Sequence, residues 1–287
     1  MRRRRTVLPL AFTLIFGLAS SAGRVVLAEA PTSVPLRMTG SGLVTVSVTI
    51  NGGGPYTFVL DTGSNRTGVS AQLAARLTLP AVATTTVVSS TGTATGNVIR
   101  LDEIALGRVV RRDLLTVVMP VDLTTVGLRA DGVLGQDFLA DETYTIDYGR
   151  RRLVWDVGEP RGTRLALKRD EGRWLVALPQ DGRGSEVVWF VPDSGAQGLV
   201  VFDRGIRLPL RLTALPDVAI STAAGSATTR AALVRLLRVG PVELADQPAV
   251  VIDRRAPDGP AGDGLLPLCL FSTVTFNGKE GYLAVGR

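Results

Sequence analysis

The chain has 287 residues, of which 45% are hydrophobic and 20% charged, a balance typical of a folded protein large enough for two small lobes. It has no histidine and a single cysteine, Cys269, which excludes His-based catalytic triads, His-ligated zinc, intrachain disulfides and paired-thiol redox chemistry. The formal net charge is +6, but four of these charges belong to Arg2 to Arg5, so the remaining chain is nearly neutral and predicts no nucleic-acid partner.

The N-terminal segment predicts export. Four arginines precede an apolar run from Val7 to Ala19, and small residues follow, a pattern typical of a secretory signal. The run is shorter than the roughly 20 residues that a transmembrane helix needs. We therefore expect residues 1–30 to be a signal peptide and leader, cleaved after Ala22 or Ala30. The mature protein is then expected to be periplasmic or secreted, with no membrane attachment.

Residues 31–160 are expected to form mainly β-structure. Alternating hydrophobicity from Leu43 to Ile50 predicts a strand, residues 51–55 a hairpin turn, and residues 56–60 a strand that ends at Asp61. Ser70 can cap a short helix at residues 71–77. Further strands are predicted at residues 98–106, 114–119, 144–147 and 153–155.

Residues 161–287 show the same character after a turn-rich boundary at residues 158–162. Strands are predicted at residues 174–178, 187–191, 233–239, 249–252, 273–276 and 282–285. No run alternates strands with long helices, which disfavours a doubly wound α/β fold. The basic cluster Arg150 to Arg152 follows a glycine between two strands and is expected to be a solvated hairpin turn.

An internal repeat organises the chain into two similar halves. The segment from Tyr56 to Ser64 is similar to the segment from Val188 to Ala196, which places Asp61 and Asp193 132 residues apart. A second pair of segments, beginning at Ala130 and Gly262, has the same offset, and two pairs of glycines, Gly92 with Gly225 and Gly107 with Gly240, have an offset of 133. Four landmarks in one order indicate duplication, with lobes at residues 31–160 and 161–287.

The repeated aspartates fit one kind of chemistry. Each follows an apolar strand and precedes a small hydroxyl residue and a glycine, which lets the backbone close tightly around the carboxyl group. If the two lobes pack about a pseudo-twofold axis, Asp61 and Asp193 face each other, share a proton and titrate as a pair. One carboxylate can then accept a proton from water while the other donates a proton to a peptide carbonyl. Aspartic proteases are the established example of such pairing.

These motifs resemble those of a known superfamily. Residues 58–64 are similar to the active-site signature of pepsin and retropepsin-like aspartic peptidases, and residues 131–135 resemble the glycine-containing element that supports that loop in those families. The resemblance implies an all-β fold of two similar acid-protease barrels related by pseudo-twofold symmetry, with short helices. It also implies an aspartic endopeptidase with catalytic residues Asp61 and Asp193, a polypeptide substrate and no cofactor, because water is the nucleophile.

The resemblance assigns supporting roles to the flanking loop residues Thr62, Gly63, Ser64, Ser194, Gly195 and Ala196. Hydroxyls of Thr62 and Ser194 are implied to lock the two loops together, and Ser64 to hydrogen-bond the outer oxygen of Asp61. Ala196 has no hydroxyl, so we expect a higher apparent pKa for the pair and a milder acid optimum than that of a pepsin. Pro267 stands where the first half has Gly135 and is expected to alter the support behind Asp193.

The same resemblance implies a mobile hairpin over the substrate, expected at residues 84–98 with its tip at residues 89–96.

Three interpretations of the whole chain remain open. The first is a monomeric peptidase in which the two lobes form a pseudo-dimer. The second is a non-catalytic peptide-binding or scaffold protein whose second lobe has degenerated. The third is a peptidase active only as a homodimer that pairs two first lobes.

Overall fold

The computed structural model describes residues 32–286, apart from residues 41, 90–91, 121, 127, 157, 159, 161, 182–183, 206–207, 223–224 and 254–261. The expected signal peptide, both expected cleavage positions and part of the expected 158–162 boundary lie outside these described residues. Within the described residues, no helix has the length and apolar character that crossing a membrane requires.

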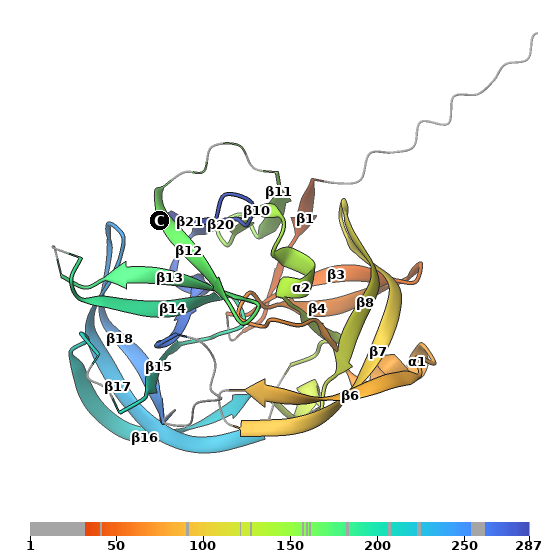
Figure 1. Ribbon diagram of the computed structural model, residues 1–287, viewed down its shortest axis with the longest axis horizontal. Helices are drawn as coiled ribbons and strands as arrows, with labels where there is room; N and C mark the ends of the chain where they lie inside the picture. Colours follow the sequence, from red (N-terminus) through yellow and green to blue (C-terminus); the bar gives the residue numbers. More distant parts are fainter. Residues whose placement is uncertain are drawn as a thin grey trace, which may run out of the picture.

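The first lobe is a six-stranded barrel that closes because β3 pairs with both β4 and β7 (Figure 1). Around the barrel the strands follow the order β3, β4, β9, β5, β8, β7. The bounds of the strands in this lobe are Arg37–Met38 (β2), Val44–Ile50 (β3), Gly53–Leu60 (β4), Gly68–Val69 (β5), Ala81–Ser89 (β6), Gly92–Leu106 (β7), Val109–Val118 (β8) and Gly132–Leu134 (β9). Two α-helices, Ala71–Arg76 (α1) and Gln136–Leu139 (α2), and a 3-10 helix, Leu123–Val126, accompany them.

The local sequence explains the strand that carries Asp61. Valines and isoleucine in β3 are buried on alternate positions, while Ser47 and Thr49 face solvent, as period-two patterning predicts. Asn51 and Gly52 both have positive φ, the geometry of a tight hairpin turn into β4. The last three residues of β4, Phe58 to Leu60, are all buried, so Asp61 follows a strand fixed in the core. Ser70 caps α1 as predicted, accepting a hydrogen bond from the Leu73 N–H.

The second lobe repeats this arrangement with strands β13, β14, β19, β15, β18, β17 and β16 in sheet order. The bounds are Arg173–Pro179 (β13), Val187–Asp193 (β14), Leu199–Asp203 (β15), Leu212–Thr222 (β16), Gly225–Val239 (β17), Val242–Asp253 (β18) and Gly264–Pro267 (β19), with a 3-10 helix at Leu268–Leu270. A side-chain amide directly after β13 links the end of this strand to the backbone of β17. The amide of Gln180 accepts from the Arg238 N–H at 3.1 Å and donates to the Arg238 carbonyl at 3.2 Å.

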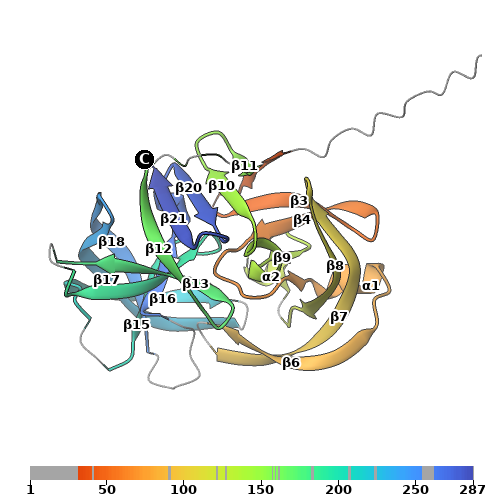
Figure 2. The same ribbon diagram turned by 45° about the horizontal axis from the view of Figure 1, so that its top comes forward.

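A shared sheet joins the lobes, and its strands lie together at the top of both ribbon views (Figures 1 and 2). Its order is β1, β11, β10, β20, β21, β12, with bounds Ser33–Pro35 (β1), Thr143–Asp147 (β10), Arg152–Trp155 (β11), Thr163–Asp170 (β12), Thr273–Asn277 (β20) and Tyr282–Gly286 (β21). At its centre β10 and β20 pair antiparallel, with Thr145 opposite Thr275 and their hydroxyl oxygens 2.6 Å apart. The predicted two-lobed all-β fold is confirmed, and the Thr145–Thr275 pair marks the axis between its halves.

Two long hairpins, β6–β7 and β16–β17, lie on the side of the molecule away from the shared sheet (Figures 1 and 2). The first was expected, but its predicted tip at residues 89–96 is wrong in extent. Residues 92–96 belong to β7 and pair with residues 85–89 of β6, and only residues 90–91 of the predicted tip lie outside the described residues. The second hairpin, which pairs Thr222 with Gly225, was not predicted.

Candidate active site

Asp61 and Asp193 come together at the ends of two equivalent strands. Asp61 directly follows β4, and Asp193 is the last residue of β14. Their carboxyl groups are hydrogen-bonded to each other. Asp193 is 7% exposed and Asp61 is partly buried. The repeat found in the sequence therefore corresponds to two carboxyl groups in direct contact across the lobe boundary.

Gly63 and Gly195 explain how the loops can approach so closely. A Cβ added to Gly63 would lie 2.3 Å from Cγ of Asp193, and one added to Gly195 would lie 2.6 Å from Cγ of Asp61. Real Cβ atoms do not approach carboxyl carbons this closely, so any side chain at either position would push the opposite carboxyl group away. Each glycine of the two motifs thus makes room for the aspartate of the other lobe.

Thr62 and Ser194 link the two loops through four buried hydrogen bonds. The Thr62 hydroxyl accepts from the Ser194 N–H at 3.0 Å and donates to the Pro192 carbonyl at 2.8 Å. The Ser194 hydroxyl accepts from the Thr62 N–H at 3.0 Å and donates to the Leu60 carbonyl at 2.7 Å. The exchange is reciprocal, and the structure brings together the two hydroxyls expected at the interface.

Backbone N–H groups hold each carboxyl group in its loop. Oδ1 of Asp61 accepts from the N–H groups of Gly63 and Ser64, both at 2.9 Å. Asp193 accepts from the N–H of Gly195 at 2.7 Å and from that of Ala196. Ser64 therefore contacts Asp61 as expected, but through its backbone, because its hydroxyl donates to the Arg66 carbonyl at 2.8 Å. Ser64 makes no hydroxyl hydrogen bond to Asp61, so the lack of a hydroxyl at Ala196 removes no equivalent bond to Asp193. The expectation that Ala196 makes the pH optimum less acidic therefore rested on a wrong contact.

Burial raises the pKa of both aspartates. For Asp61 the cause is desolvation, opposed mainly by the hydrogen bond from the Ser64 N–H and then by those from Asp193 and Gly63. Desolvation also raises the pKa of Asp193, and the charge of Asp61 adds to it, so this pKa lies well above its usual value. The pair thus favours a state in which one proton is shared between two carboxyl groups.

Equivalent supporting strands lie behind both loops. β9 pairs parallel with β4, and β19 pairs parallel with β14, where Pro267 stands opposite Asp193. Asp131 accepts from the Thr57 N–H at 2.9 Å, and Asp263 accepts from the Trp189 N–H at 2.8 Å. These two bonds have the same 132-residue offset as the aspartate pair. Pro267 therefore leaves the strand pairing behind Asp193 in place.

Two residues at the site were missed by the sequence analysis. Gln136 is buried and donates from Nε2 to the Thr62 carbonyl at 2.7 Å, bracing the first loop from behind. Its place directly after Gly135 of the supporting element could have identified it. Arg173, at the start of β13, donates from Nε to the Gly63 carbonyl at 2.9 Å. No sequence signal identifies this arginine, because the contact joins different lobes and lies outside the repeated motifs.

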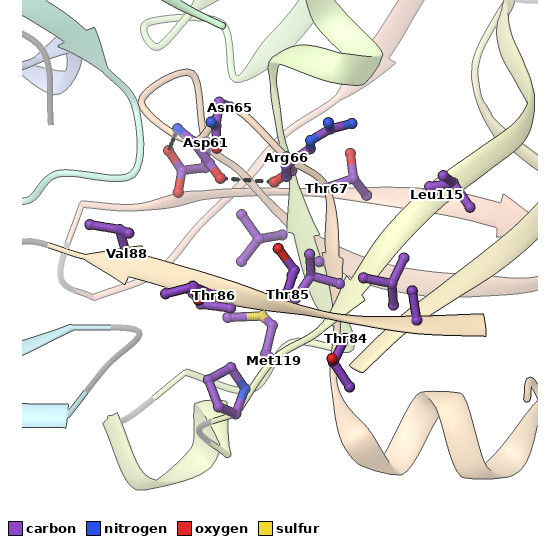
Figure 3. Close-up of a pocket in the computed structure, with 18 of the residues that line it drawn as sticks. Asp61, Asn65, Arg66, Thr67, Thr84, Thr85, Thr86, Val88, Leu115 and Met119 are labelled. Atoms are coloured by element: carbon purple, nitrogen blue, oxygen red, sulfur yellow. Dashed lines mark hydrogen bonds between the residues drawn. The ribbon is translucent and has the colours of Figure 1, made fainter. Parts of the chain in front are cut away.

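A pocket of about 570 Å³ opens beside Asp61, between the loop that carries this residue and the β6 strand (Figure 3). Figure 3 shows Val88 of β6 on the side of the strand toward the loop that carries Asp61, with Met119 on the other side. Apolar side chains and threonine side chains make up much of the lining, and Arg173 and Glu171 of the second lobe also contribute. The pocket therefore offers a mainly uncharged surface next to the carboxyl pair, suited to a side chain of an extended polypeptide.

Comparison of the chain with known protein families agrees with the arrangement of the two aspartate loops. No curated protein sequence matches the chain significantly. A family model described as aspartyl protease matches residues 46–138 and 181–268, together more than half of the chain, in one segment per lobe. Each matched segment contains one of the two aspartate loops and its supporting strand. The chain therefore belongs to the aspartyl protease family.

Proposed function

We propose that the protein is an aspartic-type endopeptidase in which Asp61 and Asp193 together activate a water molecule. The observation that carries this proposal is the direct hydrogen bond between the two carboxyl groups at the ends of equivalent strands. The family supports a protease-like activity on polypeptides. With no histidine in the chain, the acid and base must come from other groups, and a paired carboxyl system supplies both.

The proposed reaction begins with one carboxylate and one carboxylic acid. The carboxylate takes a proton from water as the water oxygen bonds to the peptide carbonyl carbon, and the carboxylic acid gives its proton to the carbonyl oxygen. The neutral tetrahedral diol then loses its C–N bond. The nitrogen takes the proton held by the first carboxyl group, and a diol hydroxyl returns a proton to the second. The pair ends the cycle in its starting protonation state.

The site also suits an extended substrate. The pocket beside Asp61 can accept an apolar side chain next to the scissile bond, and the β6–β7 hairpin forms one of its walls. β6 and β16 are the edge strands of their sheets, so their backbone groups can pair with an extended chain. An unfolded polypeptide meets these requirements, because its backbone is free to enter an edge-lined cleft.

Asp61→Asn and Asp193→Asn test the proposal directly. We expect both single variants to lose at least about a hundredfold in kcat/KM on an unstructured protein substrate between mildly acidic and neutral pH, because each removes one member of the acid–base pair. We expect pepstatin to inhibit the unmodified protein. Asp113→Asn is the matched control, since Asp113 has an exposed side chain and a positive φ that asparagine tolerates.

The same assay separates the other interpretations. Loss of cleavage only in Asp61→Asn would support a homodimer of first lobes. Absence of cleavage by the unmodified protein at every pH would support a peptide-binding scaffold. Equal activity of both variants and the control would exclude the carboxyl pair as the catalytic group.

A further inference from the structure

Arg173 connects the second lobe to the catalytic loop of the first. It begins β13, and its Nε–H donates to the carbonyl oxygen of Gly63 at 2.9 Å. The turn before it makes another contact, because Nδ2 of Asn65 donates to the carbonyl of Glu171 at 3.2 Å. The β12–β13 turn of one lobe therefore packs on the loop that carries the aspartate of the other.

A single peptide group relays the contact from Arg173 to Asp61. The carbonyl of the Gly63–Ser64 peptide accepts from the guanidinium, and the N–H of the same peptide donates to Oδ1 of Asp61 at 2.9 Å. Hydrogen bonds in such a chain polarise one another, so a cation on the carbonyl strengthens the donor on the other side. A nearby cation also favours the ionised form of a carboxyl group through its charge.

The first lobe offers no equivalent cation at the matching position. Val176 pairs with Phe190, three residues before Asp193, and Val46 pairs with Phe58, three residues before Asp61. Three residues before Val176 stands Arg173, and three residues before Val46 stands Leu43, which is 2% exposed. At matching distances along the chain from these two pairs, one lobe has a guanidinium and the other a buried alkyl side chain.

Among the described residues, Arg66 also lines the pocket beside Asp61, but its charge acts on Asp137. Arg173 faces Glu171 and Asp193 in addition to Asp61. Tyr148 and Cys269 face Asp193, and burial is the main cause that raises the pKa of each. Both therefore stay neutral over the acidic to neutral range, and Arg173 brings the positive charge to the Asp61 side.

We propose that Arg173 is a positioning residue that assigns different roles to the two aspartates, acting through the Gly63–Ser64 peptide to keep Asp61 ionised and the shared proton on Asp193. Asp61 is then the base that accepts the proton of water, and Asp193 is the acid that protonates the peptide carbonyl. The catalytic roles rest on the proposed function. The distribution of charge between the carboxyl groups does not.

The hydrogen bonds agree in direction with this assignment. Desolvation raises the pKa of Asp61, but the Ser64 N–H, the Asp193 side chain, the Gly63 N–H and the charge of Arg173 all oppose the rise. Desolvation raises the pKa of Asp193 as well, and there the charge of Asp61 and the hydrogen bond with it raise it further. The charge of Arg173 and its hydrogen bond to the Gly63 carbonyl thus act in the direction that favours the ionised form of Asp61.

The test is a pH titration of the aspartate carboxyl carbons by NMR in the full-length protein, with Asp61→Asn and Asp193→Asn spectra to identify the two signals. We compare Arg173→Leu, which removes donor and charge, Arg173→Gln, which keeps a donor without charge, and Arg173→Lys, which keeps the charge. Arg169→Gln is the matched control, because Arg169 lies in the same β12–β13 hairpin with a half-exposed side chain. Backbone amide spectra establish that each variant is folded.

We expect Asp61 to ionise at lower pH than Asp193 in the unmodified protein. Arg173→Leu and Arg173→Gln should raise the Asp61 midpoint by about one pH unit, the lower end of the usual effect of a nearby opposite charge. Arg173→Lys and Arg169→Gln should leave it in place. The acid limb of kcat/KM should move upward by the same amount in Arg173→Leu and Arg173→Gln.

Three results would overturn the inference. These are an unchanged Asp61 midpoint in folded Arg173→Leu, an unchanged midpoint in Arg173→Gln, or ionisation of Asp193 before Asp61 in the unmodified protein. The titration needs no catalysis, so it also separates this inference from the proposed function. Shifted midpoints in a protein that cleaves no substrate would reject the peptidase and retain the role of Arg173 in the charge distribution.

Discussion

At the residue scale, the loops that carry Asp61 and Asp193 are held by contacts that leave little freedom to the two carboxyl groups. Thr62 and Ser194 exchange hydrogen bonds in a buried setting, and Gly63 and Gly195 bring each loop against the opposite aspartate. Burial of two carboxyl groups in contact is unfavourable when both are ionised. Holding the two carboxyl groups in contact therefore has an electrostatic cost to folding stability, and this cost depends on pH.

The sign of that cost follows from the raised pKa values of the pair. Between the ordinary aspartate pKa of 3.8 and the raised folded values, the folded protein holds a proton that the unfolded chain has released. The contribution of the pair to stability is therefore fully present below about pH 4 and is lost as the pH rises through the folded pKa values. Each pKa unit of difference corresponds to about 1.4 kcal/mol.

Asp193→Asn should consequently gain stability relative to the unmodified protein as the pH rises from about 4 to 7, because an amide cannot ionise. Denaturant unfolding at several pH values measures this difference. The exposed-site variant Asp113→Asn should run parallel to the unmodified protein. A constant difference between Asp193→Asn and the unmodified protein across this range would contradict the prediction.

The sequence was sufficient to predict where these residues would meet, for a physical reason. Asp61 and Asp193 lie in repeated motifs, and duplicated folds bring equivalent loops to a common axis. Arg173 could not be predicted in this way, because its equivalent in the first lobe is Leu43 and its effect depends on contact with the other lobe. The bonding of the Ser64 hydroxyl was also misjudged, since a hydroxyl on a tight loop can reach a carbonyl as easily as a carboxylate.

At the element scale, an aspartate directly precedes the strand behind each loop and binds the backbone of the strand that leads to Asp61 or Asp193. Asp131 and Asp263 occupy equivalent positions, and each accepts a hydrogen bond from a backbone N–H of that strand. This role became visible only with strand pairing, which fixes which N–H lies opposite each carboxylate.

Asp131→Ala and Asp263→Ala should each lower the free energy of unfolding by about 1–3 kcal/mol, because each leaves a backbone N–H without its acceptor. The ion pair of Arg76 with Asp131 adds little, since the Arg76 side chain is 58% exposed. We therefore expect similar losses in the two variants by denaturant unfolding. A loss in only one lobe would show that the two supporting strands are not energetically equivalent.

The two long hairpins show where pattern-based prediction fails. β16 is exposed from Leu212 to Ala219, and β6 is exposed at most positions, so neither strand has a consistently buried face. Alternating hydrophobicity arises from one buried face, and without it a strand resembles a polar loop. For this reason the threonine-rich segment of β7 was taken for a turn, and the β16–β17 hairpin was not predicted.

At the scale of the whole molecule, the shared sheet decides how the lobes associate. β10 of the first lobe is paired on both sides, with β11 on one and β20 of the second lobe on the other. A homodimer of first lobes would need the edge that β20 already covers. The arrangement therefore favours a monomer in which each chain carries a complete pair of aspartates.

Specific activity should then be independent of enzyme concentration over a hundredfold dilution, and light scattering should give the mass of one chain. An equimolar mixture of Asp61→Asn and Asp193→Asn should remain inactive, because no exchange of lobes can rebuild an intact pair. Recovery of activity in the mixture would contradict a monomeric site and would favour association through separated lobes.

The hydroxyl contact between Thr145 and Thr275 has a consequence for how the protein can change. In a homodimer with such an axis, every substitution occurs in both copies. A cation beside one aspartate would then also lie beside the other. Once the copies are joined in one reading frame, each half mutates alone. An arginine can then arise in one half at the position where the other half has a leucine. Two aspartates that were once equivalent can in this way take different roles.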